Sequence, residues 1–335
     1  MSFTVNLIER GHSDTPSIER VFHEVTKGLV ARGINVITEK LPYGNGFVSI
    51  LRNLVFFRPA SADVFHVTGH AHYITLIMPV DKTVLTIHDA GILHLRTGLR
   101  RWVLKKLFFD LPLKRLRFIT AISEATKAEL VAFTGCDPMK ITVIGNPVPS
   151  SYRPKSKEFN AAEPRILFVG TAPHKNLDRA LKALEDIPCS LRVVGELSVD
   201  QKQEIERTGV PYTNATALND DLMRHEYENA DIILFPSHFE GFGMPIIEAQ
   251  AIGRPVITSD LAPMNDVAGG GAVLVNPDEP DEIRNAVIRV IGDDRFRADL
   301  VAKGLENVAR YSTEQISGQY IEIYDRICGK TTPDA

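Results

Sequence analysis

Short apolar runs alternate along the chain with segments in which apolar residues recur every three or four positions. Apolar runs bounded by turn residues predict strands, and the longer helix-period segments predict helices. The strands predicted in the first half are Phe3–Ile8, Ile34–Thr38, Asp63–Val67, Thr83–His88, Phe118–Ser123 and Ile141–Gly145. Those predicted in the second half are Arg165–Gly170, Leu191–Gly195, one within Val210–Asp220, Asp231–Phe235, Pro255–Ser259 and Ala272–Val275. Short apolar strands separated by helices predict an α/β protein with parallel sheets covered on both faces.

The alternation breaks at Asn146–Ala162, a stretch rich in Pro, Ser and Lys without an apolar period. This composition is typical of a linker. A length of 335 residues suits two domains. We therefore predict two Rossmann-like, doubly wound domains, residues 1–150 and 151–311, followed by a closing helix within 312–330.

Composition and charge exclude several classes of protein. Hydrophobic residues make up 44% of the chain and charged residues 24%, an ordinary globular balance. A net charge of −4 predicts no general attraction to nucleic acid. The three cysteines are isolated, which favours a reducing, cytoplasmic location. We predict no membrane span, since no apolar run reaches about eighteen residues, and no signal peptide, since the N-terminal segment MSFTVNLIER lacks a long apolar core.

The segment Phe235–Asp260, FPSHFEGFGMPIIEAQAIGRPVITSD, is the most informative part of the chain. It places seven residues between Glu240 and Glu248, with a Gly-Phe-Gly turn and Pro245 in that interval. The pattern predicts a strand, a tight glycine turn and a helix N-terminus. Glycine lets the backbone approach a ligand, and a helix N-terminus favours phosphate. Two carboxylates on either side of a bound phosphate could grip hydroxyl groups, which favours a nucleotide sugar as the ligand.

This segment resembles the E-x7-E signature of the retaining family-4 glycosyltransferases, which have the GT-B fold. Further similarities extend along most of the chain, in TIHDAGI (Thr86–Ile92), AISEATKAEL (Ala121–Leu130), VIGNPV (Val143–Val148) and VGTAPHKNLDRALKAL (Val169–Leu184). The resemblance implies that the first domain binds the acceptor and the second the donor nucleotide, with catalysis in the cleft between them. It also implies that the closing helix packs back on the first domain.

The resemblance assigns roles to residues of the second domain. Glu240 would hydrogen-bond the sugar and stabilise positive charge at the anomeric carbon, and Glu248 would hold the ribose. Lys175, in the loop GTAPHKN, would neutralise the diphosphate leaving group. The other expected donor-binding residues are Gly241, Phe242, Gly243, Met244, Pro245, Ile246, Thr171 and His174.

The lysine loop departs from the family pattern in one respect. Relatives often carry an arginine there, and this chain has Thr171 and His174 at those positions. We therefore expect Lys175, the helix N-terminal amides and a protonated His174 to share the diphosphate charge. The nucleobase is expected near Asn214–Asp221, where the sequence does not distinguish uracil from guanine.

The first domain carries a second set of candidates. His88 and Asp89 end a strongly apolar strand, and the carboxyl edge of a parallel sheet is where ligands bind. By resemblance, His88 approaches the donor sugar, while Asp89 and Asn146 lie on the acceptor side. The cluster His66, His70 and His72 could be a metal site but lacks a fourth ligand, which favours an acceptor-side or structural role.

The first βα loop, Glu9–Phe22, is expected to line the acceptor side through Gly11 and His12. It carries one glycine where relatives often carry a pair. No G-x-G-x-x-G follows the first strand, which argues against NAD as a cofactor.

The segment Leu95–Phe118 contains eight basic residues and one acidic, with Leu, Trp and Phe at helical spacing. Such a pattern suits an anionic membrane surface, as in a peripheral membrane protein. The same pattern also suits a helix that packs its apolar face on the sheet and exposes its basic face. Both interpretations stay open at this point.

We predict a metal-independent, retaining hexosyltransferase of polysaccharide biosynthesis. Its donor would be a GDP- or UDP-hexose of the mannose or glucose type, and its acceptor a saccharide or lipid-linked glycan. No cofactor is expected, and the chain has no D-x-D triplet of the kind that metal-dependent GT-A enzymes use. The alternatives are a GT-B sugar-nucleotide epimerase and a non-catalytic nucleotide-sugar-binding subunit.

Overall fold

The structure, a computed structural model, describes residues 3–11, 17–44, 46–91 and 98–329. The chain forms two compact units, one of Met1–Pro147 with Ser312–Ala335 and one of Val148–Tyr311. In the described residues each unit contains a six-stranded sheet in which every pairing is parallel. The predicted α/β class with two Rossmann-like sheets is confirmed.

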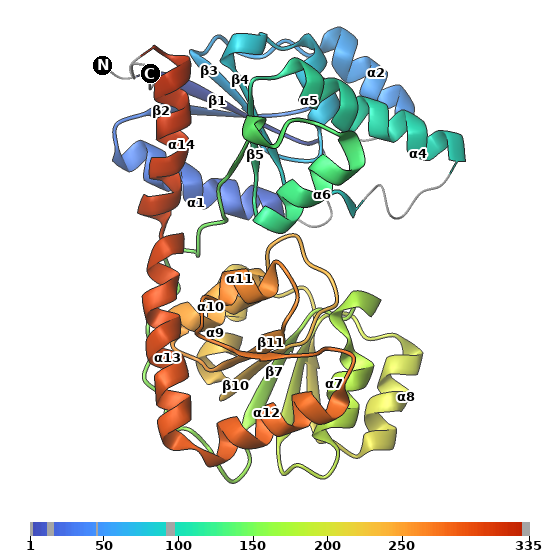
Figure 1. Cartoon of the computed structure of the whole chain (residues 1–335), viewed down its shortest axis with the longest axis vertical. Helices are drawn as coiled ribbons and strands as arrows, with labels where there is room; N and C mark the ends of the chain where they lie inside the picture. Colours follow the sequence, from blue (N-terminus) through green and yellow to red (C-terminus); the bar gives the residue numbers. More distant parts are fainter. Residues whose placement is uncertain (1–2, 12–16, 45, 92–97, 330–335) are drawn as a thin grey trace. The chain divides into compact units, whose positions relative to one another are not determined.

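The first unit has the strand order β2-β1-β3-β4-β5-β6 (Figure 1). Its strands are β1 (Thr4–Glu9), β2 (Asn35–Lys40), β3 (Val64–Val67), β4 (Thr83–Ile87), β5 (Phe118–Ala121) and β6 (Ile141–Val143). Its helices are α1 (Ser17–Ala31), α2 (Phe47–Phe56), α4 (Gly98–Lys105), α5 (Leu111–Arg115), α6 (Glu124–Thr134) and α14 (Thr313–Ile327). Short 3-10 turns are η1 (His72–Ile77), η2 (Val80–Lys82) and η4 (Pro138–Lys140), and η3 (Lys106–Asp110) is a π-helix that joins α4 to α5.

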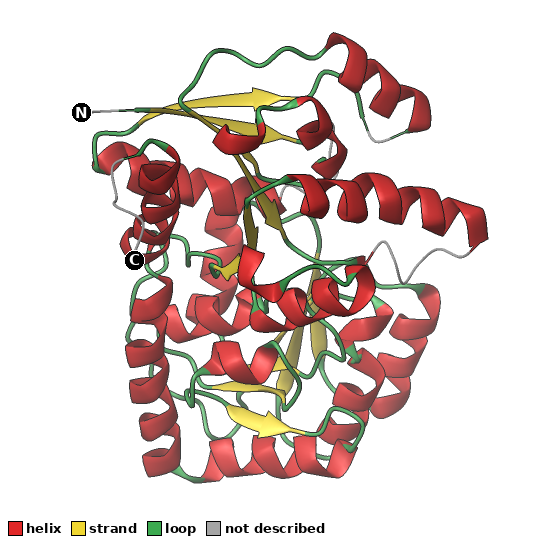
Figure 2. Cartoon of the chain, turned by 45° about the horizontal axis from the view of Figure 1, so that its top comes forward, coloured by secondary structure: helices red, strands yellow, loops and turns green. Residues whose placement is uncertain are grey.

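The second unit has the strand order β12-β11-β10-β7-β8-β9. Its strands are β7 (Arg165–Val169), β8 (Ser190–Val194), β9 (Tyr212–Ala215), β10 (Ile232–Phe235), β11 (Val256–Ser259) and β12 (Val273–Val275). Its helices are α7 (Leu177–Leu184), α8 (Val199–Thr208), α9 (Asp220–Asn229), α10 (Met244–Ile252), α11 (Met264–Ala268), α12 (Pro280–Gly292) and α13 (Asp294–Val308), with 3-10 turns η5 (Pro173–Lys175) and η6 (Ala309–Tyr311). Helices cover both faces of the sheets (Figure 2).

The central strands of both sheets are buried. Every residue of β3, β4, β10 and β11 is shielded from solvent. A strand buried on both faces must be apolar along its whole length, which is why the sequence shows continuous apolar runs. Local signals fix the helix ends. Ser123 caps α6 by accepting a hydrogen bond from the Thr126 amide, and Gly135 ends it at φ +67°.

The closing helix α14 packs against α1 within the first unit (Figure 1). Gly28 of α1 makes this approach possible, because a Cβ there would lie 2.4 Å from the Oγ of Ser317. Tyr320 and Tyr324 of α14 are buried, and the Tyr324 hydroxyl lies 2.7 Å from Nδ1 of His66. These contacts make α14 part of the core of the first unit.

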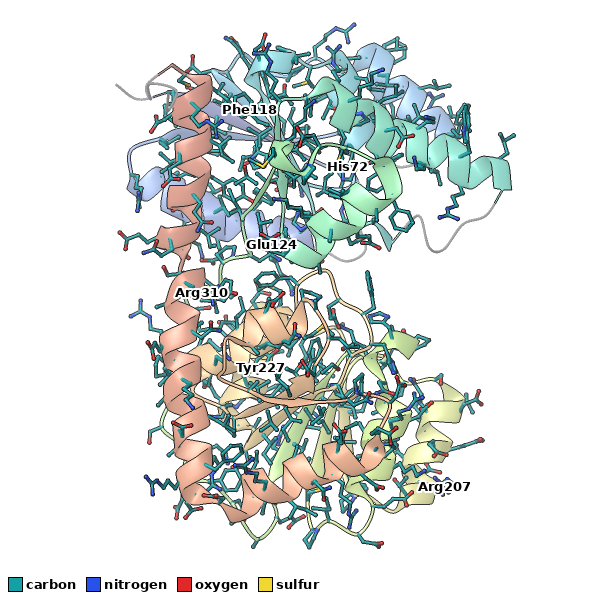
Figure 3. All side chains as sticks on the ribbon, viewed as in Figure 1. His72, Phe118, Glu124, Arg207, Tyr227 and Arg310 are labelled. Atoms are coloured by element: carbon teal, nitrogen blue, oxygen red, sulfur yellow. The ribbon has the colours of Figure 1, made fainter. Side chains whose placement is uncertain are left out.

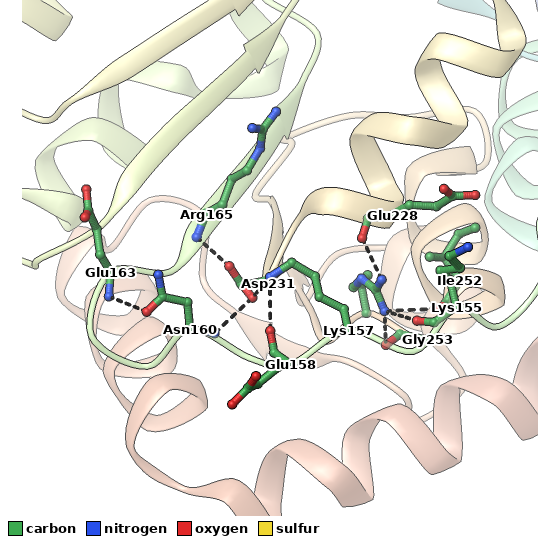
Figure 4. A network of polar contacts seen from close by, with 11 residues as sticks. Lys155, Lys157, Glu158, Asn160, Glu163, Arg165, Glu228, Asp231, Ile252 and Gly253 are labelled. Carbon is green, nitrogen blue, oxygen red and sulfur yellow. Dashed lines mark hydrogen bonds and ion pairs between the residues drawn. The ribbon is translucent and has the colours of Figure 1, made fainter.

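The irregular segment predicted as a linker is bonded to the second unit over much of its length (Figure 4). Asp231 holds it at the amino end of β10. Its buried carboxylate contacts the Lys157 ammonium and accepts hydrogen bonds from the amides of Asn160 and Arg165. Arg254, also buried, donates to the carbonyl oxygens of Lys155 and Glu228. These bonds hold residues 155–165 against the surface of the second unit, and we call this segment the strap.

Candidate active site

The second sheet changes direction between β7 and β10, because the chain moves outward from β7 to β8 and β9 and then returns to the other side of β7 at β10. Ligands of open parallel sheets bind at such a switch point, outside the carboxyl ends of the strands. The two loops that leave these strands are the lysine loop after β7 and the FPSHFEGFG turn after β10. The tertiary fold thus brings together two motifs that lie about 65 residues apart in sequence.

The turn after β10 leads directly into α10. Gly243 adopts φ +106°, a left-handed conformation that favours glycine, and α10 begins at Met244 with Pro245 in its first turn. No side chain caps this helix N-terminus. The partial positive charge of this helix N-terminus suits a phosphate group.

The side chains around this turn divide into buried and accessible ones. Phe242 is buried, with its ring edge against Tyr311. Ile246 is also fully buried, so its side chain belongs to the core, and its amide donates to the carbonyl oxygen of Gly243 at 3.0 Å. Met244 and Gly241 are partly exposed.

Lys175 and Glu240 meet at the switch point. Lys175 Nζ lies 2.6 Å from Glu240 Oε1, and both side chains are more than four-fifths buried. The same ammonium lies 4.8 Å from the centre of the Phe235 ring, within the range of a cation–π contact. A partly desolvated lysine held in this way is a preorganised positive charge.

Gly170, at the end of β7, is required for the position of Lys175. It adopts φ +92°, and a Cβ there would lie 2.8 Å from Cε of Lys175. The lysine side chain therefore runs directly over this glycine. The single glycine of the VGTAPHK segment is therefore needed both for the turn and for the packing of the Lys175 side chain.

Glu248 lies on α10, where its Oε2 accepts a hydrogen bond of 2.6 Å from the hydroxyl of Tyr227. Tyr227 lies in the interior of the second unit (Figure 3). Burial, and then the charge of Glu248, hold the pKa of Tyr227 well above its usual value, so this hydroxyl stays a donor. Tyr227 orients Glu248, and the E-x7-E spacing gives no indication of this partner.

Two further predicted donor-site residues lie in the lysine loop. The hydroxyl of Thr171 donates to the carbonyl oxygen of Glu196 at 2.6 Å, so it ties the ends of β7 and β8 together. Burial, and then the charge of Lys175, hold the pKa of His174 below its usual value. His174 is therefore neutral at pH 7 here, which argues against the expected share of positive charge; a neutral imidazole can still donate one hydrogen bond.

Asn176 is a structural residue of the site that the sequence analysis missed. It adopts φ +66°, and its buried amide donates to the carbonyl oxygens of Pro236 and Pro277 at 3.1 and 2.7 Å. It thereby joins the lysine loop to the turn after β10. An asparagine directly before a helix is a recognisable cap signal, but its long-range partners are not visible in the sequence.

In the first unit His88 follows β4 at the carboxyl edge of the sheet. Its side chain is buried, and Nε2 lies 2.9 Å from the carbonyl oxygen of Thr68. Burial, with a contribution from His70, lowers the pKa of His88 to about 4, so the ring is neutral at pH 7.

Asp89 pairs with a histidine that the sequence analysis placed in another cluster. Its Oδ2 lies 3.5 Å from Nε2 of His70, and its Oδ1 accepts a 2.8 Å hydrogen bond from the amide of Gly91. Burial by itself would raise the pKa of Asp89, but the hydrogen bond and charge of His70 outweigh it and hold the pKa at about 2. The carboxylate is thus ionised throughout the neutral range.

His66 and His72 take structural positions. His66 is buried between Tyr324 and Thr86, with 2.7 Å contacts at both ring nitrogens. His72, in the interior of the first unit (Figure 3), uses Nδ1 to contact the carbonyl oxygen of Phe108 at 2.7 Å. Burial lowers the pKa of each to about 3. Among the described residues, no group of three or more His, Cys, Asp or Glu side chains is arranged to hold a metal ion.

The remaining acceptor-side candidates are less informative. Gly11 is buried, and a Cβ there would lie 2.5 Å from the carbonyl oxygen of Tyr43, so it packs against the segment after β2. Asn146 is buried at the end of the first unit. His12 lies outside the described residues.

The proposed base region follows β9. The side-chain amide of Asn214 donates to the carbonyl oxygens of Val193 and Gly195, at 3.0 and 2.8 Å. These bonds fix the end of β9 against β8. The amide NH2 of Asn214 is thus engaged within the protein.

Two family models cover most of the chain. Residues 37–152 match the model described as Glycosyltransferase Family 4, and residues 163–293 match the model described as Glycosyl transferases group 1. The chain belongs to the family-4 glycosyltransferases. The second match spans both the lysine loop and the E-x7-E segment, which meet at the switch point.

Similar proteins agree with this family. O-antigen chain mannosyltransferase B of Escherichia coli is 25% identical over 73% of this chain and 70% of its own length. The serotype-specific mannosyltransferase WbdA of the same species is 24% identical over 77% of this chain, which corresponds to 36% of WbdA. HepE of Anabaena, solved with UDP and glucose, has a TM-score of 0.75 at 16% identity and covers 96% of this chain and 99% of its own. That likeness shows the fold, and the predicted GT-B fold is confirmed.

Proposed function

We propose that this glycosyltransferase moves a hexose from a nucleoside diphosphate sugar to a saccharide or lipid-linked glycan, with retention and without a metal ion. The observation that carries the proposal is the Lys175–Glu240 pair beside the free N-terminus of α10. The mannosyltransferase relatives favour mannose as the sugar. The structural neighbour HepE was solved with UDP and glucose, which supports a nucleoside diphosphate sugar as the donor.

The pair suggests how the site responds to its donor. Without a donor, Lys175 and Glu240 neutralise each other. A diphosphate would attract Lys175 and the amides of α10, and Glu240 would then be released to accept hydrogen bonds from sugar hydroxyls. The same lysine would stabilise the leaving diphosphate as the glycosidic bond breaks.

Retention needs no nucleophile from the protein in this scheme. The acceptor oxygen attacks the face from which the diphosphate departs, and the leaving phosphate oxygen takes the acceptor's proton. Positive charge on the sugar ring would be balanced by Glu240. Lys175 would supply the charge that a divalent metal supplies in metal-dependent transferases, which supports metal independence.

The donor proposal predicts a thermal shift in the presence of EDTA. The melting temperature of the second unit should rise with one of UDP, GDP or ADP, because a ligand at a hundred times its Kd adds about 2.7 kcal/mol. The shift should be lost in Glu248→Ala and retained in Glu306→Ala, a control on α13. A shift that requires Mg²⁺ would contradict metal independence, and no shift with any nucleotide would contradict the donor site.

We also propose that the first unit contacts an anionic membrane surface, and a feature outside the predicted segment supports this. One face of α2 exposes apolar side chains to between 48% and 67%: Phe47, Val48, Leu51, Val55 and Phe56. The only charged residues from Leu41 to Ala62 are Arg52 and Arg58. In the described part of Leu95–Phe118, Leu99 and Trp102 of α4 are 77% and 57% exposed.

Figure 1 draws α2 and α4 at the same side of the first unit. Exposed apolar side chains with basic neighbours favour the interface of an anionic bilayer. The packing interpretation of the segment also holds in part, because Phe108, Phe109 and Leu113 are buried. No helix in the described residues is long and apolar enough to cross a membrane.

Vesicle pelleting tests the membrane proposal. The protein should pellet with phosphatidylglycerol vesicles and less with phosphatidylcholine vesicles, and added salt should release it. Phe47→Ser combined with Trp102→Ala should reduce pelleting severalfold. Met139→Ser, which removes an 88% exposed apolar side chain elsewhere in this unit, should not. Equal pelleting with phosphatidylglycerol and phosphatidylcholine vesicles would contradict the membrane proposal.

A further inference from the structure

The first sheet has its own switch point, between β1 and β3. His70 follows β3 at this point, three residues beyond the end of the strand. Its surroundings combine three polar groups from two other elements: Asp89 and His88 after β4, and His72 at the start of η1. Arg10, after β1, lies against the neighbouring Gly69. Arg10 is paired with Glu19 of α1 at 2.8 Å.

His70 differs from the other histidines of this cluster in its exposure. The side chains of His66, His72 and His88 are buried, and each has at least one ring nitrogen fixed by a hydrogen bond of 2.7 to 2.9 Å. The side chain of His70 is 29% exposed, and its partner Asp89 is 34% exposed. Within this cluster, the His70–Asp89 pair is therefore the part that a ligand in solvent can reach.

The geometry points to a defined tautomer of His70. Nε2 faces Asp89 Oδ2 at 3.5 Å, and the other carboxylate oxygen is fixed by the Gly91 amide at 2.8 Å. A carboxylate facing Nε2 keeps the proton on that nitrogen and leaves the lone pair on Nδ1. The separation is long, as is common for catalytic hydrogen bonds before a substrate binds.

We propose that His70 and Asp89 form a hydroxyl-binding subsite for the saccharide acceptor, in which Nδ1 of neutral His70 accepts a hydrogen bond from an acceptor hydroxyl. Asp89 is the positioning residue, because it fixes the tautomer and the ring. This inference rests on the proposed glycosyl transfer and adds to it the residue that positions the acceptor.

A second observation supports a ligand that donates hydrogen bonds. The ring of His72 is stacked near that of His70, with centroids 6.0 Å apart. Its Nδ1 contacts the Phe108 carbonyl oxygen and must carry the proton, so Nε2 has the lone pair. This buried Nε2 has no hydrogen-bond partner among the described residues. A hydrogen-bond acceptor without a partner in the described part of the chain thus lies next to the accessible ring of His70, and hydroxyl groups are the donors that a saccharide supplies.

Replacing Asp89 by asparagine tests the tautomer directly. The amide oxygen of the new side chain can keep the contact with Gly91, but its NH2 group donates to Nε2 of His70. The proton then moves to Nδ1, which becomes a donor and no longer accepts from the acceptor hydroxyl. We expect KM for the acceptor to rise about tenfold in Asp89→Asn and in His70→Ala, as for the loss of one buried hydrogen bond. Donor KM and the nucleotide-induced thermal shift should stay unchanged. His23→Ala, at an exposed position on α1, is the matched control and should keep the acceptor KM of the wild type.

Nitrogen-15 NMR of the imidazole groups in the full chain decides the proposal without any turnover. His70 should show the Nε2–H tautomer in the wild type and the Nδ1–H tautomer in Asp89→Asn, and its signals should shift with methyl α-mannoside while those of His23 do not. A wild-type Nδ1–H tautomer, or an acceptor KM within twofold of wild type in both variants, would overturn it. Absence of nucleotide binding in every variant would contradict the proposed donor chemistry instead, and the tautomer would still be measured.

Discussion

Replacing Lys175 with alanine should lower kcat for sugar transfer by about a hundred- to a thousandfold, the range observed when one preorganised electrostatic group is removed. The ammonium is mostly buried and lies 2.6 Å from Glu240. Its loss removes the cation expected to balance the leaving diphosphate and leaves the Glu240 carboxylate without this partner. Steady-state kinetics with the donor identified by thermal shift provide the measurement.

Two further variants separate this effect from a general loss of structure. Lys182→Ala removes an exposed lysine on α7, a few residues away, and should retain full activity. Gly170→Ala leaves the Lys175 charge in place but puts a methyl group 2.8 Å from its Cε, so it should also impair turnover. A Lys175→Ala enzyme within threefold of wild type in kcat would show that the diphosphate charge is balanced elsewhere.

The largest effect on stability is expected at Asp231, far from the candidate active site along the same strand. Asp231→Ala should lower the free energy of unfolding of the second unit by about 3 to 5 kcal/mol, the range for breaking a buried ion pair. The side chain of Asp231 is only 2% exposed, and Lys157 and the amides of Asn160 and Arg165 all depend on it (Figure 4). Hydrogen exchange of amides in the second unit, measured in increasing urea, gives the change, because the single tryptophan, Trp102, lies in the first unit.

Asp299→Ala is the matched control for this loss of charge. Asp299 pairs with Lys303 on α13, where both side chains are 53% exposed, and such surface pairs contribute about 0.5 kcal/mol. Asp231→Asn should be intermediate, because it keeps one acceptor oxygen. Equal destabilisation by the two alanine variants would mean that the strap is not held by this carboxylate.

Sequence patterns predicted the central strands most clearly, because β3, β4, β10 and β11 are buried on both faces. Burial of that kind forces a continuous apolar run, as in IILF of β10 and TVLTI of β4, and such runs stand out from the helix-period segments between them. The turn into α10 was equally visible, because the left-handed φ of Gly243 requires glycine and the first helical turn tolerates Pro245. Both features depend on a few consecutive residues only, so they can be recognised in the sequence.

The sequence was less informative about which side chains are charged and which side chains they contact. His174 was expected to carry charge, but burial and Lys175 keep it neutral. His70 was grouped with its neighbours in sequence, whereas its partner Asp89 comes from the next strand of the sheet. Protonation and pairing depend on distances and desolvation, which the order of residues does not specify.

The sequence by itself determined the two parallel sheets, the family and the motifs that lie on strand–turn–helix segments, because propensity, periodicity and turn chemistry act over a few consecutive residues. Only the tertiary structure decided which side chains meet. It placed Lys175 against Glu240, Tyr227 against Glu248, and Asp89 against His70, in each case across elements separated by at least 19 positions along the chain. Those pairs follow from strand order and burial, and both are properties of the packed chain.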